Sequence, residues 1–459
     1  MQAVILAGGT GKRVFPLAVN KPKPMFKLLG KPLIQHIIEL LKVNGLDSFV
    51  VVIGHGGQQI REFFGDGGKF GVHIDYAVQE AALGMANALM TAEGLVEKHF
   101  FVVNADDLFE GVLVADMVAK FRECDAEIVL SCKPVEETWK FGIVTVDGDQ
   151  VTGLVEKPPK GREKSNLAVI GVYLLSKRIF EYFQGIPVSD HQYEDAIQNF
   201  IEDGNRVCYV RYDRFFAGYK YPWDLFKMNA YLMDTQVTQS NIEEGVLVAE
   251  SAKVEGNVLI RKGSKILDHA VVKGPCYIGE NTVVGNNCLI RGYTSIGDNC
   301  IVGFTTEVKS SLIGDNCLFH MNYVGDSIIS DDCLFGAGAT TANFRFDEKN
   351  VKVVVNGQKV DSGINKLGAI VGDHSRAGIN SSLAPGVKIG PYSIVGSGVN
   401  LQKDLSPGRM MFMGDKGSVV KDNTLTLTLE EKRKLTEVLE KYKQTKSKQH
   451  DGMQDSVIA

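Results

Sequence analysis

Residues 278–302 read IGENTVVGNNCLIRGYTSIGDNCIV, and an aliphatic residue returns in this stretch at every sixth position. The same spacing continues outward from Val248 to Val308, where eleven consecutive positions are Val or Ile. Several of them are followed by Gly and then by Asp, Glu or Asn, as expected for one short strand and one turn per six residues. The period predicts a β-helix whose coils stack on each other.

The period is interrupted once. It slips near Leu312 and returns from Val371 to Leu401. Residues 344–367 have no six-residue phase, and Asn356-Gly357 lies there between two β-branched runs, Val351–Val355 and Gln358–Val360. An Asn-Gly pair between such runs predicts a hairpin. We therefore expect a loop, 344–367, that projects from the solenoid.

The cysteines belong to the same pattern. Five of the eight lie in the repeated segment, in contexts such as IGDNC, and no pair has the CxxC spacing of a zinc site. Eight in 459 residues is also far below the density of a disulfide scaffold. We predict small core residues that face inward, not ligands, at Cys276, Cys288, Cys300, Cys317 and Cys333.

The first half of the chain has a different pattern. Apolar runs typical of strands occur at residues 3–6, 49–53, 100–103 and 127–131, and Leu33–Leu41 has helical spacing that ends before Gly45. This alternation predicts an α/β domain with a Rossmann-like, mainly parallel sheet. The expected divisions are this α/β domain at 1–229, a helical linker at 230–244, the β-helix at 245–405, and a tail at 406–459 with a helix at about 429–443.

Composition excludes some partners. With 50 Lys and Arg against 55 Asp and Glu, the chain has a net charge of −5 and lacks the basic excess of a nucleic-acid-binding protein. No run of about 18 apolar residues suggests a membrane span, and the start, MQAVILAGG, has no basic leader region. We expect a soluble, cytoplasmic protein that binds neither nucleic acid nor membrane.

A glycine-rich loop follows the first predicted strand. Residues 6–13 read LAGGTGKR, so that backbone N–H groups could approach phosphates, with Arg13 as an added cation. The loop has neither the Walker order nor GxGxxG. Taken alone, it is equally compatible with an ordinary tight turn between a strand and a helix.

Together with Lys21-Pro22-Lys23-Pro24, this loop resembles the sugar-1-phosphate nucleotidyltransferase family. The family pattern LAGGxGTRLxPLT…PKP is present here as LAGGTGKRVFPLA…KPKP. Further matches, in the family's order, are Gln79 with Leu83-Gly84, Asp106, Phe141-Gly142 and Val155–Pro158.

The resemblance implies a role for each matching residue. A nucleoside triphosphate and a sugar 1-phosphate are both polyanions, so the site must cancel charge. Arg13 would face the β- and γ-phosphates, Lys23 the α-phosphate and Lys157 the sugar phosphate, while Asp106 would hold Mg²⁺. Gly142 and Glu156 would bind the sugar. The nucleobase would be framed by Leu6, Ala7, Gly8, Gly9, Gln79 and Gly84.

The chain departs from the family at three positions. Where the family has W-x-D-x-G-x-P, residues 216–222 read FAGYKYP, so Gly218 replaces the second metal-binding Asp. Ala105 replaces the Gly before the first one, and Val169 replaces an Asn. The sequence leaves open whether Asp107, Asp213 or Asp224 supplies the missing ligand.

The repeated segment resembles the left-handed β-helix of hexapeptide acyltransferases. Within it, HMNYVGD at 320–326 and GAGATTANF at 336–344 follow the patterns H-x-x-Y-x-G-D, G-A-G-T and Asn-aromatic. These patterns are found in the acetyltransferase half of bifunctional glucosamine-1-phosphate acetyltransferases/N-acetylglucosamine-1-phosphate uridylyltransferases, and the archaeal two-domain type is the nearest likeness. Leu334 stands at one family Asn.

This second resemblance also implies roles. A glucosamine ammonium must lose a proton before its nitrogen attacks a thioester, and the neutral imidazole of His320, with an ordinary pKa of about 6.5, suits that task. Tyr323 and Asn343 would contact the acetyl acceptor. The remaining implied residues are Lys309, Lys349 and Lys352 for the acceptor phosphate, and Ala337 and Gly396 for acetyl-CoA.

The sequence thus predicts a bifunctional homotrimeric enzyme that uses Mg²⁺, acetyl-CoA, UTP or dTTP, and a sugar 1-phosphate. The product would be a nucleotide sugar such as UDP-N-acetylglucosamine. Two alternatives stay open. One is an acetyltransferase whose N-terminal domain binds nucleotide without turnover, and the other is a non-catalytic regulatory subunit.

Overall fold

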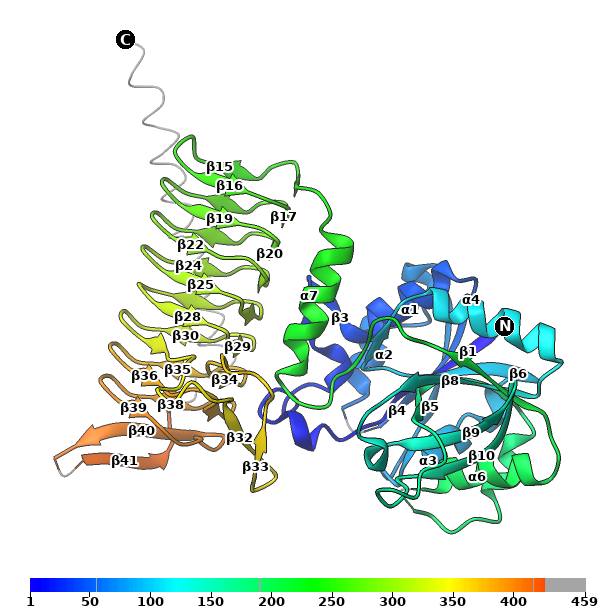
Figure 1. Ribbon diagram of the computed structural model, residues 1–459. Coiled ribbons are helices and arrows are strands. Elements are labelled where there is room, and N and C mark those ends of the chain that lie inside the picture. The colour runs from blue at the N-terminus through cyan, green and yellow to red at the C-terminus, as the bar shows by residue number, and fades with distance from the viewer. Residues whose placement is uncertain (55, 190, 416, 426–459) are drawn as a thin grey trace.

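The computed structural model describes residues 1–54, 56–189, 191–415 and 417–425, in two parts that lie side by side (Figure 1). An α/β domain holds the N-terminus, and a tall stack of coils follows it. The helix expected at 429–443 lies outside the described residues. No helix among the described residues is both long and apolar enough to cross a membrane.

The N-terminal domain is built on one mixed sheet of nine strands in the order β5-β4-β1-β6-β11-β8-β12-β10-β9. The strands are β1 Gln2–Ala7, β4 Ser48–Ile53, β5 His73–Val78, β6 His99–Asn104, β8 Ile128–Pro134, β9 Gly142–Asp147, β10 Gln150–Glu156, β11 Leu167–Ser176 and β12 Val207–Arg211. The four predicted strands are confirmed as β1, β4, β6 and β8. Strands β5, β4, β1 and β6 are parallel, as predicted.

The other half of this sheet differs from the mainly parallel expectation. Strand β11 runs antiparallel to both β6 and β8, and β10 runs antiparallel to β9 and β12. Strands covered on both faces are apolar throughout whatever their direction, so the apolar runs did not distinguish the two cases.

Helices cover the sheet. They are α1 Leu33–Val43, which confirms the helix predicted there, α2 Gln58–Phe64, α3 Met85–Met90, α4 Val112–Cys124, α5 Ile179–Phe183, α6 Gln192–Glu202 and α7 Asp224–Gln236. Two small ribbons complete the domain. One pairs β2 Lys27–Leu28 with β3 Lys31–Pro32, and the other pairs β7 Asp107–Phe109 with β13 Phe216–Gly218. The helix expected in a linker at 230–244 is α7, which starts earlier, and strands begin again at Asn241.

The coils form the predicted left-handed parallel β-helix, with three parallel sheets as its faces. The first sheet holds β14 Asn241–Ile242, β17 Val258–Ile260, β20 Cys276–Ile278, β23 Thr294–Ile296, β26 Leu312–Ile313, β29 Ile328–Ile329, β34 Ile370–Val371 and β37 Lys388–Ile389. The second begins with β15 Leu247–Val248, β18 Lys265–Ile266, β21 Val283–Val284, β24 Ile301–Val302, β27 Leu318–Phe319, β30 Leu334–Phe335, β35 Arg376–Ala377 and β38 Ile394–Val395. The third holds β16 Lys253–Glu255, β19 Val271–Lys273, β22 Leu289–Ile290, β25 Glu307–Lys309, β28 Tyr323–Gly325, β31 Thr340–Thr341, β36 Ser382–Leu383 and β39 Asn400–Leu401.

The slip of the repeat has a structural cause. Ile278 pairs with Ile296, a full coil of eighteen residues later, whereas Ile296 pairs with Ile313 after only seventeen. Glu307 pairs with Tyr323 after sixteen. The shortened corners contain residues with positive φ, at Ser310, Met321 and Asp326. The phase is therefore lost in the segment that carries the His320–Asp326 motif, while the inward residues stay buried.

The five cysteines of the repeat all lie in the β-helix core, at most 1% exposed, as predicted. The predicted hairpin is also present, as β32 Lys352–Val355 and β33 Gln358–Asp361, and both residues of its Asn356-Gly357 turn have positive φ. Figure 1 shows it reaching from the solenoid toward the N-terminal domain. A second hairpin, β40 Arg409–Gly414 with β41 Gly417–Asp422, was not predicted, and β40 extends the second sheet.

The two parts pack tightly against each other. One continuous hydrophobic cluster includes Leu232 and Met233 of α7 and Leu312 and Ile328 of the β-helix. The same cluster includes Val353 of the projecting hairpin. The arrangement of the two parts is thus set by buried apolar contacts, the kind that contribute most to stability.

Two lysines of the N-terminal domain bind a ladder of aspartates on the β-helix. The turns after Ile313, Ile329 and Val371 present Asp315, Asp331 and Asp373, and in each case Oδ1 accepts the backbone N–H of the preceding coil. Lys27 Nζ lies 2.6 Å from Asp315 Oδ2. Lys21 Nζ lies 2.5 Å from Asp331 Oδ2 and 3.2 Å from Asp373 Oδ1.

Candidate active sites

A cavity of about 490 Å³ opens beyond the carboxyl ends of β1 and β6. This edge of a largely parallel half-sheet is where α/β proteins bind ligands. The cavity brings together most residues that the family resemblance implied for nucleotide and metal binding. Those that line it are Leu6, Ala7, Gly8, Gly9, Arg13, Lys23, Gln79, Gly84 and Asp106.

The glycine loop has its shape because side chains would collide there. A Cβ on Gly8 would lie 2.5 Å from Gln79 Oε1. Gln79 is held in place because its Nε2 donates to Gly84 O (3.2 Å) and to Asn87 Oδ1 (2.9 Å). Gly11 has φ of 67° and starts the short turn that carries Arg13. The backbone of the loop is therefore open to a ligand on the cavity side.

Lys23 and Asp106 form an ion pair at the cavity wall, with their side chains 13% and 22% exposed. Lys23 also lies over the ring of Tyr219, 5.2 Å from its centroid. Asp106 sits in the turn between β6 and β7, where its backbone O accepts from Tyr219 N. The lysine expected to face the α-phosphate and the aspartate expected to hold Mg²⁺ are thus adjacent.

Asp107, the next residue, is buried at 8% exposure, and its Oδ2 accepts from Asn104 Nδ2 at 2.8 Å. Burial, followed by the charge of Asp106, raises the pKa of Asp107 to about 7. In the small ribbon, Asp107 lies directly opposite Gly218. Sequence reasoning left Asp107 as one of three candidates, and its position across from Gly218 was not visible in the sequence.

Glu156 and Lys157, which the resemblance implied for the sugar and its phosphate, lie at the end of β10. Glu156 Oε1 lies 2.9 Å from Lys157 Nζ, and a Cβ on Gly142 would lie 2.9 Å from Glu156 Oε2. Glu194 of α6 lies beside them and was missed by sequence reasoning, because it belongs to no motif that we recognised. Burial, and then the charge of Glu156, raise the pKa of Glu194 to about 7.

In the β-helix, three residues implied by the second resemblance lie together, and two of them contact Asp326. Lys309 Nζ lies 2.8 Å from Asp326 Oδ2, and Asn343 Nδ2 donates to the same oxygen. Asn343 Nδ2 is also 3.3 Å from Tyr323 OH. Asp326 belongs to the motif at 320–326, but the sequence did not indicate its role. The structure shows that it is the common partner of Lys309 and Asn343.

His320 occupies the corner between β27 and β28. Its backbone N–H donates to Asn322 Oδ1 at 2.5 Å, and Asn322 Nδ2 in turn donates to Gly336 O and Ala339 O. This network fixes the corner and leaves the imidazole on the exposed side. The ring is therefore accessible to a substrate from outside the coil.

The other implied residues of this half are placed less closely. Lys349 and Lys352 are exposed on the projecting loop, and within the described part of the chain neither forms a hydrogen bond or ion pair with Asp326 or its partners. Ala337 O accepts from Asn380 N, and Gly396 N donates to Met411 O of β40. The Gly396 amide is thus already bonded to the unpredicted hairpin. Leu334 is 37% exposed on β30.

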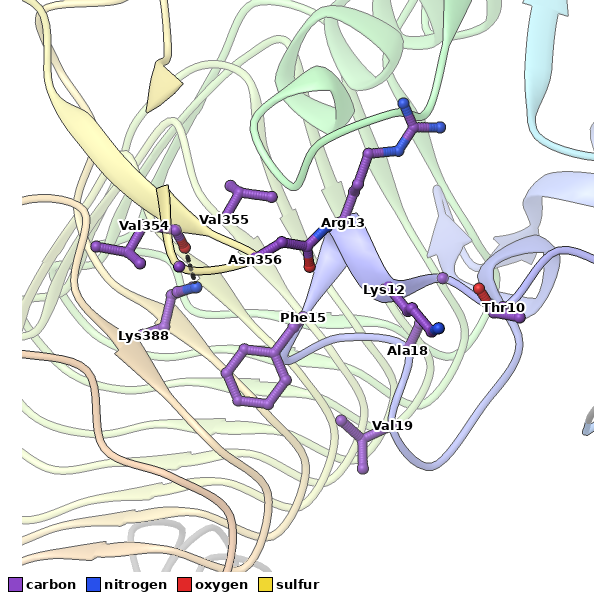
Figure 2. A pocket seen from close by; sticks show the side chains of 12 residues that line it. Thr10, Lys12, Arg13, Phe15, Ala18, Val19, Val354, Val355, Asn356 and Lys388 are labelled. Atoms are coloured by element: carbon purple, nitrogen blue, oxygen red, sulfur yellow. Dashed lines mark hydrogen bonds between the residues drawn. The ribbon is translucent and has the colours of Figure 1, made fainter. Parts of the chain in front are cut away.

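A second cavity, of about 480 Å³, lies where the two parts of the chain meet (Figure 2). Phe15, Ala18 and Val19, which follow the glycine loop in the chain, line one side of the cavity. The tip of the projecting hairpin lines the other side. Lys388 Nζ donates to Val354 O and lies 3.2 Å from Asp404 Oδ2. Thr10 to Arg13 line both cavities, so the nucleotide loop adjoins the acetyltransferase-type hairpin.

The family comparisons match both halves. Residues 2–240 match the nucleotidyl transferase family. Residues 257–292, 275–310 and 368–403 match the bacterial transferase hexapeptide (six repeats) family, and the interval between the last two holds the short coils and the projecting loop.

The chain also matches known proteins over nearly their whole length. The chain is 37% identical over 428 residues to "Bifunctional protein GlmU" of Methanococcus maripaludis strain C7, covering 92% of this chain and 99% of that protein. It is 35% identical over 424 residues to the protein of the same name from Methanocaldococcus jannaschii, with coverage of 91% and 98%. It is 32% identical over 414 residues to "Bifunctional sugar-1-phosphate nucleotidylyltransferase/acetyltransferase" of Sulfurisphaera tokodaii, with coverage of 89% and 99%.

Proposed function

Since this chain belongs to the family of bifunctional sugar-1-phosphate nucleotidylyltransferase/acetyltransferases, we propose that it performs both reactions on one sugar. The first reaction acetylates an amino-sugar 1-phosphate with acetyl-CoA. The second transfers a nucleotidyl group from UTP or dTTP to the acetylated sugar 1-phosphate and releases pyrophosphate. The observation that carries this proposal is the cavity in which the glycine loop, Lys23 and Asp106 converge.

In nucleotidyl transfer, an oxygen of the sugar 1-phosphate attacks the α-phosphorus, and the bond to the β-phosphate oxygen breaks. The backbone of Gly8 and Gly9 receives the nucleotide, with Gln79 beside the base. Arg13 faces the β- and γ-phosphates, and Lys23 faces the α-phosphate, where negative charge gathers as the bonds change. Lys157 neutralises the attacking phosphate so that two polyanions can approach each other.

Mg²⁺ would neutralise the phosphate oxygens when bound at Asp106. The donor set fits, since a carboxylate beside the nucleotide cavity is a hard oxygen ligand. No group of three or more His, Cys, Asp or Glu side chains able to hold a metal occurs in the described residues. A cation there would therefore take most of its ligands from substrate and water, as Mg²⁺ usually does beside phosphates.

In acetyl transfer, His320 accepts a proton from the amino sugar, and the freed amine attacks the thioester carbonyl. The C–S bond then breaks, the proton held by His320 passes to the coenzyme A thiolate, and the acetylated nitrogen releases its remaining extra proton to water. Lys309, Tyr323 and Asn343 would hold the acceptor; Asp326 orients Lys309 and Asn343, and Asn343 contacts Tyr323. Lys349 and Lys352 would grip its phosphate from the loop, and Ala337 and Gly396 would lie along acetyl-CoA.

The test is a pair of assays on the purified full chain. One measures pyrophosphate release from UTP or dTTP with Mg²⁺ and N-acetylated sugar 1-phosphates. The other measures thiol release from acetyl-CoA with amino-sugar 1-phosphates, and His320→Gln should abolish it. Thiol release without pyrophosphate release would favour an acetyltransferase with a nucleotide-binding domain. The absence of both would favour a regulatory subunit.

We also propose that the β-helix forms a homotrimer. The first sheet packs against the N-terminal domain, and the other two flat faces can pack against neighbouring copies in a closed ring of three. Light scattering at micromolar concentration should give three times the mass of the chain. A monomeric mass with full acetyl transfer would overturn this part of the proposal.

A further inference from the structure

The second metal carboxylate of the family is absent from this chain, and the structure shows what occupies its place. Gly218 of β13 lies directly opposite Asp107 of β7. A Cβ on Gly218 would lie only 2.6 Å from Asp107 Oδ1. A side chain that began at Gly218 would thus start at the point where the Asp107 carboxylate already is.

A second glycine completes this space from the other side. A Cβ on Gly171 of β11 would lie 2.3 Å from Asp107 Oδ2. Gly171 falls in the irregular part of β11, where the register against β8 shifts between Val169 and Tyr173. Two glycines therefore leave the volume that the carboxylate of Asp107 fills.

We propose that Asp107 supplies the second carboxylate of the divalent-cation site, reaching from the strand opposite Gly218 to the place of the missing aspartate. This inference rests on the proposed nucleotidyl transfer. Asp107 Oδ2 is held by Asn104, and Oδ1 accepts no hydrogen bond from the described residues although the side chain is more than nine-tenths buried. A carboxylate oxygen that accepts no hydrogen bond keeps its lone pairs available to a cation.

The other two candidates for the second metal carboxylate, Asp224 and Asp213, already contact other groups of the protein. Asp224 Oδ2 accepts from the backbone N–H groups of Lys220 (2.8 Å) and Tyr221 (2.6 Å) at the start of α7. Asp213 is 57% exposed and lies 2.8 Å from Arg211 Nε. Asp107, by contrast, directly follows Asp106 in the chain and begins β7.

The experiment measures Mn²⁺ binding by the electron paramagnetic resonance signal of free Mn²⁺, with α,β-methylene-UTP present so that no turnover occurs. Because even an outer-shell partner of a metal typically accounts for 10–100-fold in affinity, Asp107→Asn should weaken Mn²⁺ binding by at least about tenfold. Asp213→Asn is the matched control and should leave the affinity unchanged. Thiol release from acetyl-CoA reports that each variant is folded.

A carboxylate swap makes the test independent of a single substitution. Asp107→Ala should lose Mn²⁺ affinity, and Asp107→Ala with Gly218→Asp should recover most of it. Gly218 does not have positive φ, so Asp there meets no backbone strain. Gly218→Asp alone should not improve binding, because it places a second carboxylate against Asp107.

The outcomes separate this inference from the proposed function. A wild type that releases pyrophosphate, with an Asp107→Asn variant that binds Mn²⁺ as tightly as the wild type, would overturn the assignment of Asp107 alone. The same holds if Gly218→Asp alone tightens Mn²⁺ binding. A wild type that neither binds Mn²⁺ with nucleotide nor releases pyrophosphate would overturn the proposed nucleotidyl transfer, and this inference with it.

Discussion

Removing the Lys21 ammonium should destabilise the contact between the two halves of the chain. Lys21 is 14% exposed and touches two carboxylates, Asp331 at 2.5 Å and Asp373 at 3.2 Å, which are 35% and 7% exposed. Burial alone lowers the pKa of Lys21, and the two aspartates raise it above its ordinary value. Burial alone raises the pKa of Asp331, and Lys21 outweighs this to leave it below the ordinary value.

Lys21→Met keeps the length of the side chain and removes its charge. Removing one partner of a buried pair typically costs about 3–5 kcal/mol, and we expect about 3 kcal/mol because Asp331 keeps some contact with water. At roughly 2–4 °C per kcal/mol for a domain of this size, the interface transition should fall by about 6–12 °C. Differential scanning calorimetry at one fixed scan rate, from pH 3 to 8, measures it.

The cost arises from two carboxylates left without their cation, so removing their charge should reduce it. Adding Asp331→Asn to Lys21→Met should recover part of the lost transition temperature, since Asn keeps an oxygen for the N–H of Asp315. The difference between wild type and Lys21→Met should also narrow as the pH falls below about 4, where carboxylates become protonated. A double variant less stable than Lys21→Met, or a difference that is constant with pH, would refute the reasoning.

Three further outcomes follow from the sites. Asp106→Asn should abolish pyrophosphate release and leave thiol release within a few-fold of wild type, because the two reactions use separate halves of the chain. Normal pyrophosphate release by this variant would show that Asp106 does not belong to the nucleotidyl-transfer site. Gly8→Ala places a methyl group 2.5 Å from Gln79 Oε1 and should raise KM for the nucleoside triphosphate. Initial rates measure this KM, and an unchanged value would show that the loop has room for the methyl group. The pKa of Glu194 is about 7 in the folded protein against 4.5 for the free side chain, so the fold disfavours the ionised form. Glu194→Gln removes that ionisation and should stabilise the protein relative to wild type. The gain should grow as the pH rises from 4.5 to 8 and reach up to about 3 kcal/mol. A thermal shift that does not grow with pH would contradict the assignment of that pKa.

Much of the fold was visible in short stretches of sequence. The six-residue period shows the β-helix over residues 248–308, whereas strand β1 with its glycine loop and the hairpin at Asn356-Gly357 are each encoded in one short contiguous stretch. Their signals are a period of six, an apolar run before glycines, and a turn that needs positive φ. Strand direction in the second half of the N-terminal sheet was not visible, because buried strands of either direction have the same composition.

The site was only partly predictable for a related reason. Motifs name the residues that a family uses, and the nucleotide cavity indeed gathers Gly8, Lys23, Gln79 and Asp106. A motif shows that one of its residues is absent from a chain, but it does not show which other residue takes that place. Asp107 and Gly218 are far apart in the chain, and only the pairing of β7 with β13 places one across from the other.

The order of the elements, the repeat and the chemistry of the loops were therefore determined by local sequence, since each depends on neighbouring residues alone. The tertiary structure decided how the halves meet and which carboxylates face the cavity. Lys21 and Asp331 are 310 positions apart, and their contact depends on the stacking of the coils, which places Asp315, Asp331 and Asp373 on successive turns. Packing between distant surfaces sets such contacts, because a shift of one residue in a strand changes the face on which a side chain emerges.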